Sequence, residues 1–191
     1  MAIPTSELQK INPSAVIELF ELQLIAAIHG SDQLYRFHSG SNQNGNGEIV
    51  WQGNSYTRFP IEAEGFEFTG RGQIPRPTLT VSNVLSTLTT LIASVNAFTP
   101  ANDLNGAKLT RIRTTADNID AANFSGGTNP FGTPSSNKYP DEVFFLDRKV
   151  TENRQIVQYE MRGENDHANV KVPKRQITRK DFDGVGTFID A

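Results

Sequence analysis

The sequence predicts a mainly β domain, either a small sandwich or a barrel, with one short amphipathic helix and long loops. Apolar and polar residues alternate in several short segments, which is the period of a half-buried strand. The chain also has 15 glycines and 10 prolines among many Asn, Ser and Thr residues. These residue types favour turns between short strands. The 12 phenylalanines supply bulk for a core.

Length and composition exclude several classes of protein. A chain of 191 residues forms one domain, or one domain with a smaller companion. We expect no membrane span, because no apolar run approaches ~18 residues, and no secretory signal, because residues 1–10 lack its pattern. The formal net charge of -3 argues against a general nucleic-acid coat. The absence of cysteine removes disulfides, thiolate zinc sites and cysteine-bound iron–sulfur clusters.

The N-terminal region contains one short helix signal and one ambiguous segment. A hydroxyl at Thr5 or Ser6 caps a predicted helix that ends before Pro13. Residues 15–28 (AVIELFELQLIAAI) fit a helix that stops at Gly30. They equally fit a strand buried on both sides. Local propensity slightly favours the helix, and the residues alone leave both interpretations open.

The middle of the chain reads as short strands and turns. Strands are predicted at 34–38, at 66–69 and at 78–83, where apolar and polar residues alternate. Residues 49–52 and 56–60 form a predicted hairpin around Gly53-Asn54, a pair that accepts positive φ. Residues 39–47 form a polar turn.

A change of period marks the second half. Residues 84–96 carry apolar side chains at three- and four-residue spacing and predict an amphipathic helix. A strand follows at 107–115, and then a long non-periodic segment at 116–140 that is either functional or mobile. Residues 142–150 and 155–162 predict a hairpin, with Val157, Tyr159 and Met161 on its apolar face. A further strand is possible at 170–172. We therefore expect a β-rich domain at 1–168 and a basic extension at 169–191.

The search for catalytic or metal-binding chemistry finds no convincing centre. His29, His38 and His167 are scattered, without the spacing of a metal site. Carboxylate pairs such as Glu62 with Glu64, or Asp117 with Asp120, occur in any acidic chain, and only their separation in space could make one catalytic. We therefore expect no enzyme activity, no cofactor and no metal.

Surface residues are better candidates for function. The basic extension lacks the interleaved aromatic residues of a nucleic-acid stacking surface, so we expect it to contact protein rather than nucleic acid. The loop at 116–140 is the second candidate contact. The residues expected at interfaces are Lys171, Lys174, Arg175, Arg179, Lys180 and Phe131.

Several sequence blocks, taken in order, resemble one known family. They lie at residues 51–53 (WQG) with Tyr56, 59–61 (FPI), 65–67 (GFE), 70–72 (GRG), 76–83 (RPTLTVSN), 120–124 (DAANF), 147–149 (DRK), 152–154 (ENR) and 173–177 (PKRQI). Together they resemble the minor tail protein L family of lambda-like siphophages, over residues of about 15–178. The resemblance implies a β-rich, tail-tube-like fold, and it makes residues 15–28 mostly strand.

The resemblance also implies a function. Family members are virion structural proteins of the tail tip, present in the host cytoplasm during assembly. They are not enzymes, and they form a ring between the distal ring of the tail tube and the central hub. We expect a trimer rather than a hexamer. The family's C-terminal segment contains cysteines associated with an iron–sulfur cluster, whereas this sequence has none. Alternatives are another tail component, such as a distal tail or tube-terminating protein, and, with less support, a tail-associated hydrolase or a glycan-binding module.

Overall fold

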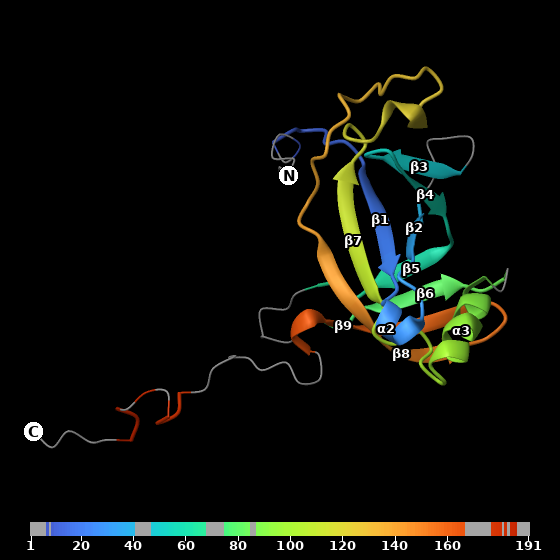
Figure 1. The fold of residues 1–191 in the computed structure, drawn as a ribbon. Coiled ribbons are helices and arrows are strands. Elements are labelled where there is room, and N and C mark those ends of the chain that lie inside the picture. The colour runs from blue at the N-terminus through green and yellow to red at the C-terminus, as the bar shows by residue number, and fades with distance from the viewer. Residues whose placement is uncertain are drawn as a thin grey trace, which may run out of the picture.

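The computed structural model describes residues 7, 9–40, 47–67, 75–84, 87–166, 177–180, 182 and 184–186. Figure 1 shows the path of the chain through a curved β structure with few helices. Its elements are β1 (Val16–Gln23), α2 (Ala26–His29), β2 (Leu34–His38), β3 (Glu48–Trp51), β4 (Asn54–Arg58), β5 (Ile61–Glu64), β6 (Thr78–Ser82), α3 (Thr87–Phe98), β7 (Lys108–Thr115), η1 (Ala121–Asn123), β8 (Glu142–Glu152), β9 (Ile156–Gly163) and η2 (Glu164–Asp166).

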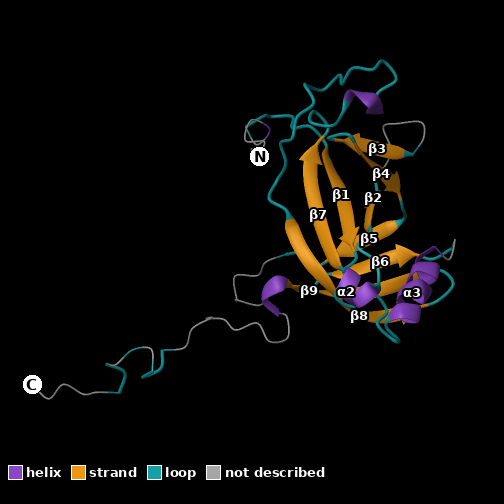
Figure 2. Cartoon of the chain, viewed as in Figure 1, coloured by secondary structure: helices purple, strands orange, loops and turns teal. Residues whose placement is uncertain are grey.

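The described strands form a single nine-stranded sheet in the order β3-β4-β2-β1-β7-β8-β9-β6-β5. All neighbours are antiparallel except β2 and β4, which pair in parallel at two positions. The sheet curves so strongly that β5 and β6 lie across β1 rather than continuing beside it (Figure 2). The result is an open barrel with α2 and α3 at one end and the loop 116–140 at the other. The predicted mainly β fold is confirmed.

Strand β1 decides the ambiguity at residues 15–28. Leu19 and Phe20 are adjacent, yet both are almost completely buried, because consecutive strand residues point to opposite faces of a covered sheet. The strand pairs with β2 on one side and with β7 on the other. Only the end of the segment is helical, and α2 stops at Gly30, which has a φ of 72°. A side chain at Gly30 would also collide with Phe98 at 2.7 Å.

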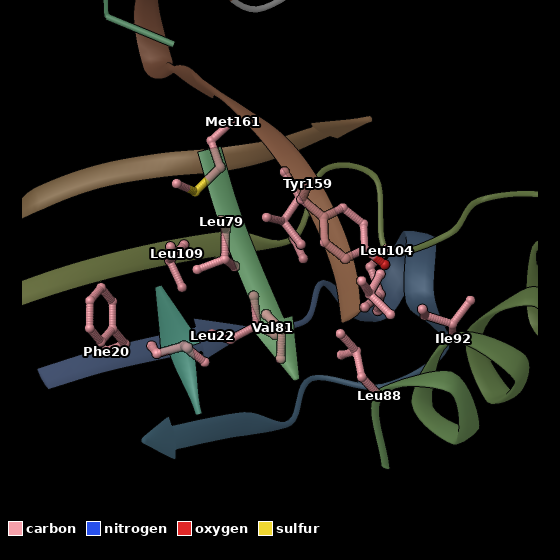
Figure 3. Close-up of a cluster of buried hydrophobic side chains, with 14 of the residues drawn as sticks. Phe20, Leu22, Leu79, Val81, Leu88, Ile92, Leu104, Leu109, Tyr159 and Met161 are labelled. Atoms are coloured by element: carbon pink, nitrogen blue, oxygen red, sulfur yellow. The ribbon is translucent and has the colours of Figure 1, made fainter. Parts of the chain in front are cut away.

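The larger hydrophobic cluster fills the concave side of the sheet, and we call it the inner cluster (Figure 3). Apolar residues from β6 and β9 meet those from β1 and β7 there, while α3 closes one end with Leu88, Ile92 and Val95. Its buried members are Phe20, Leu22, Leu24, Ile61, Leu79, Val81, Leu88, Ile92, Val95, Leu104, Ala107, Leu109, Phe144, Leu146, Val157, Tyr159 and Met161.

A second cluster lies on the other face of β1 and β7, and we call it the outer cluster. Its buried members are Leu19, Ile49, Trp51, Tyr56, Ile112 and Ile119. The β3–β4 hairpin and the start of the loop 116–140 supply four of these residues. The segment with no sequence periodicity therefore contributes directly to the core.

Several predicted boundaries differ from the structure. Helix α3 begins at residue 87 and ends at 98 rather than spanning 84–96. Strand β5 occupies 61–64, whereas the predicted strand at 66–69 is not formed at 66–67, and 68–69 lie outside the described residues. Phe66 instead packs edge-on against Phe144, with ring centroids 5.3 Å apart.

The β3–β4 turn also lies one residue earlier than predicted. Its central residues are Gln52 and Gly53, both with positive φ, at 52° and 72°. Two consecutive residues of this conformation match the twist of a tight hairpin. The predicted strand at 170–172 lies outside the described residues, as do Thr5, Ser6 and Leu8 of the predicted helix before Pro13.

Burial on both faces of β1 predicts a large cost for truncating either face. We expect Leu19→Ala to lower the free energy of unfolding by about 2–5 kcal/mol, because Leu19 is fully buried in the outer cluster. Val16→Ala, at a position 54% exposed on the same strand, should change it by less than about 0.5 kcal/mol. Chemical denaturation measures both. Equal small effects would contradict the role of the outer cluster.

Candidate assembly surfaces

The loop 116–140 covers the side of β3 that pairs with no other strand of the described sheet. Asn123 in η1 accepts a hydrogen bond from the Val50 backbone N–H at 2.7 Å and donates one to the Val50 carbonyl, also at 2.7 Å. The side-chain amide of Asn123 thus makes the two hydrogen bonds to Val50 that the backbone of a neighbouring strand would make. Unpaired strand edges otherwise attract other chains. Asn123 is 1% exposed, so these bonds are shielded from water.

The same loop also fastens the β3–β4 turn. Asp120 accepts hydrogen bonds from the backbone N–H groups of Gln52 and Gly53, at 3.2 and 2.7 Å. Gln52 adopts a positive φ that a residue with a side chain disfavours. Its strained conformation is therefore held by a carboxylate 68 residues further along the chain.

Two further asparagines organise the rest of the loop. Asn129 is 6% exposed and donates to the carbonyls of Ala116, Asp117 and Ile119, at 2.9, 3.2 and 3.0 Å. Asn118 accepts a bond of 2.5 Å from the Ser135 hydroxyl. These contacts fold the two halves of the loop onto each other. The loop is an ordered platform, and its lack of periodicity reflects side-chain to backbone bonding rather than mobility.

The platform displays a tip formed by residues 130–134 (PFGTP), which we call the loop tip. All five residues are exposed. Phe131 is 56% exposed and rests edge-on against Phe124, with ring centroids 5.9 Å apart. Gly132 lies so close to Asp117 that an added side chain would approach its Cβ to 2.8 Å. The loop tip therefore presents an apolar ring from a packed base.

An apolar cavity of about 690 Å³ opens into the concave side of the barrel. Four consecutive residues of β2, 34–37, line it, although alternate residues of a strand point to opposite faces. The opening therefore runs along an edge of β2, beyond its short pairing with β4 at Phe37 and His38. Helix α3 lines the other side with Thr90, Leu91 and Ser94. We call this space the barrel cavity.

Most charged side chains on the sheet are already paired with one another. Arg111 bonds to Glu18 and, at 2.9 Å, to Glu142, and its guanidinium lies 4.3 Å from the ring centre of Phe66. Glu62 and Glu64 differ, because both are exposed on the outward side of β5 and no ion pair reaches them from the described residues. They make β5 an acidic edge of the sheet.

Comparison with known proteins identifies the kind of molecule to which these surfaces belong. The sequence pattern of the family described as phage minor tail protein L matches residues 27–183. The chain belongs to this family. It is also 33% identical over 129 residues to the tail tip protein L of Escherichia phage lambda. That alignment covers 68% of this chain and 51% of the lambda protein, so the chain spans about half the length of this relative.

In this L family protein, His29 and the pair Asp117 and Asp120 make structural contacts. The His29 ring accepts from the Ile25 N–H at 2.8 Å and lies 3.1 Å from the Asn105 carbonyl. Asp117 and Asp120, nominated as a carboxylate pair, are both engaged by hydrogen bonds within the loop and the β3–β4 turn. Among the described residues, no three His, Asp or Glu side chains are placed to hold a metal ion. None of their helices is long and apolar enough to cross a membrane.

Three of the six predicted interface residues lie in the described part of the chain. Phe131 lies on the loop tip, and Arg179 and Lys180 are exposed in the C-terminal part of the chain. Lys171, Lys174 and Arg175 lie outside the described residues, as does His167. Sequence analysis missed the barrel cavity and the anchoring roles of Asn118, Asn123 and Asn129. The only signal for these asparagines was their abundance in the loop.

The two bonds from Asn123 to the edge of β3 predict a specific loss of stability. Asn123→Ala leaves the Val50 N–H without its partner and removes one of two bonds to the Val50 carbonyl, which keeps the bond from the Asp120 N–H at 3.2 Å. We expect a decrease of about 1–3 kcal/mol in the free energy of unfolding. Ser125→Ala, at an exposed position of the same loop, is the matched control. Denaturation of the isolated protein measures both, and an equal effect of the two changes would contradict the anchoring role.

His38 predicts a pH dependence of stability. It is fully buried, and this burial lowers the pKa of its imidazole below the ordinary value of 6.5. The unfolded chain therefore binds a proton that the folded chain resists, so stability should fall as the pH drops below about 6.5. We expect His38→Gln to reduce this slope between pH 6.5 and 5, a range above the ordinary pKa of carboxylates. Denaturation at several pH values measures the slope of the free energy of unfolding against pH. An unchanged slope in the His38→Gln protein would contradict the role of His38.

Proposed function

We propose that this protein is a non-enzymatic structural component of the phage tail tip. It would form a ring between the distal ring of the tail tube and the central hub that carries host recognition. The observation that supports this most strongly is the family match over residues 27–183, together with the similarity to a lambda protein named for the tail tip. Its working parts are surfaces: the loop tip, the acidic edge at β5 and the basic extension.

Ring formation requires two different surfaces of each copy to meet. The acidic edge, with Glu62 and Glu64, and the basic residues of the extension have opposite charges. We propose that the extension of one copy meets the acidic edge of the next, in a trimeric ring. Lys171, Lys174, Arg175, Arg179 and Lys180 would supply the positive charges. Such contacts at the rim of an interface contribute mostly orientation and association rate.

Cryo-electron microscopy of intact particles tests the proposed position and function. We expect this chain to lie in a ring between the tube and the hub. Before the particle is assembled, we expect the chain to be in the host cytoplasm. Its copy number separates this position from that of another tail component, such as a distal tail or tube-terminating protein. Absence of the chain from the tail would overturn the proposal.

Charge reversal tests the proposed contact at the acidic edge. We expect Glu62→Lys with Glu64→Lys to weaken self-association about 3- to 30-fold, because exposed ion pairs contribute about 0.2–1 kcal/mol each and reversal adds repulsion. Higher salt should shrink the difference. Asp32→Lys reverses one charge at an exposed site away from β5 and serves as the control for each single reversal, Glu62→Lys or Glu64→Lys.

The reciprocal change, Arg179→Glu with Lys180→Glu, should restore association of the doubly reversed protein. Sedimentation velocity of the purified full chain measures the self-association of each variant. If neither single reversal at β5 has more effect than Asp32→Lys, the contact is not at this edge.

A further inference from the structure

We propose that the loop tip of one copy seats in the barrel cavity of a second copy. The proposal deepens the ring described above and rests on that proposed function, because it names the apolar contact between neighbouring subunits. It concerns surfaces different from the charged edge and extension, so the two contacts can be tested separately.

The loop tip has the properties of a preformed apolar ligand. Charged residues make up 20% of the chain, yet residues 121–137 contain none. Phe131 is held against Phe124, and Asn129 ties the segment before it to three backbone carbonyls. Prolines at 130 and 134 restrict the backbone further. A segment that is already ordered loses little conformational entropy when it binds.

The barrel cavity has complementary properties. Its lining is mostly aliphatic and aromatic, and hydroxyl groups such as those of Ser55 and Ser94 supply part of its polarity. Among the described residues that line it, Arg36 alone is charged, and its Nε donates to the Glu21 carboxylate at 3.0 Å, so its charge is paired. Burying an unpaired charge in the cavity would cost free energy. The loop tip has no charged residue, so its insertion avoids that cost.

The positions of the two surfaces exclude insertion within one chain. Phe131 packs on Phe124, which contacts the outer cluster. The barrel cavity, in contrast, is lined by inner-cluster residues such as Leu79 and Val81, on the other face of the sheet. The loop 116–140 and α3, which also lines the cavity, lie at opposite ends of the molecule (Figure 1). A loop tip therefore reaches only the cavity of another copy. Such a contact joins unlike surfaces and leaves one of each free, so it passes from copy to copy and closes into a ring if the rotation allows. This is the symmetry that the proposed ring requires.

Cross-linking between two differently tagged proteins tests the contact directly. The chain has no cysteine, so each introduced thiol is unique. We mix Thr133→Cys protein, whose thiol lies on the exposed loop tip and leaves Phe131 in place, with Thr90→Cys protein, whose thiol lines the barrel cavity, and add a short bismaleimide. The control mixture replaces the second protein with Ala93→Cys, an exposed position of α3 outside the cavity lining. We expect the mixed dimer to form at least tenfold faster in the first mixture, and equal rates would overturn the proposal.

Sedimentation of point variants provides an independent measurement. Phe131→Asp should weaken self-association at least tenfold, whereas Phe131→Leu should retain it, and an unchanged thermal midpoint shows that both variants are folded. If the Phe131→Asp protein associates as the wild type does, the tip–cavity contact is wrong while the proposed ring stands. If the wild-type chain stays monomeric at its highest soluble concentration, self-docking is overturned, and the particle reconstruction tests the ring separately.

Discussion

The structure depends on the burial of β1 from both sides. Leu19 and Phe20 point to opposite faces and neither reaches solvent, so the sheet needs cover on its convex as well as its concave surface. The concave side is filled by the curvature of the sheet itself and by α3. Neither α2 nor α3 covers the convex side, because both lie at one end of the barrel. The β3–β4 hairpin and the loop 116–140 cover it instead, which is why a segment with no strand or helix pattern is part of the core.

That requirement explains how the loop is ordered. A long connection cannot satisfy its backbone groups by strand pairing, so side chains must do so. The side-chain amide of an asparagine offers both a donor and an acceptor, and the loop uses those of Asn118, Asn123 and Asn129. The carboxylate of Asp120 adds two acceptors at the β3–β4 turn. Each bond joins the loop to itself or to the sheet. The exposed tip at Phe131 is consequently a fixed feature of the surface.

Many polar groups of the described residues bond to the protein's own backbone or to one another. Buried histidines bond to backbone groups, and the arginines of β7 are paired with carboxylates on β1 and β8. What remains available to a partner is a set of surfaces: an apolar tip, an apolar cavity and an acidic edge. Such a distribution suits a subunit that works by contact with neighbouring chains, as a minor tail protein does.

The sequence by itself determined the mainly β class, the positions of β2, β6, β7 and the β8–β9 hairpin, and the family, because these depend on local alternation and on ordered sequence blocks. The resemblance predicted that residues 15–28 are mostly strand, although their local propensity slightly favours a helix. Tertiary burial overrides that propensity at 16–23, and only the end of the segment is helical. Only the tertiary structure could decide which asparagines anchor the loop and that β2 borders a cavity. Both arise from residues tens of positions apart, whose meeting is set by the curvature of the sheet rather than by any local pattern.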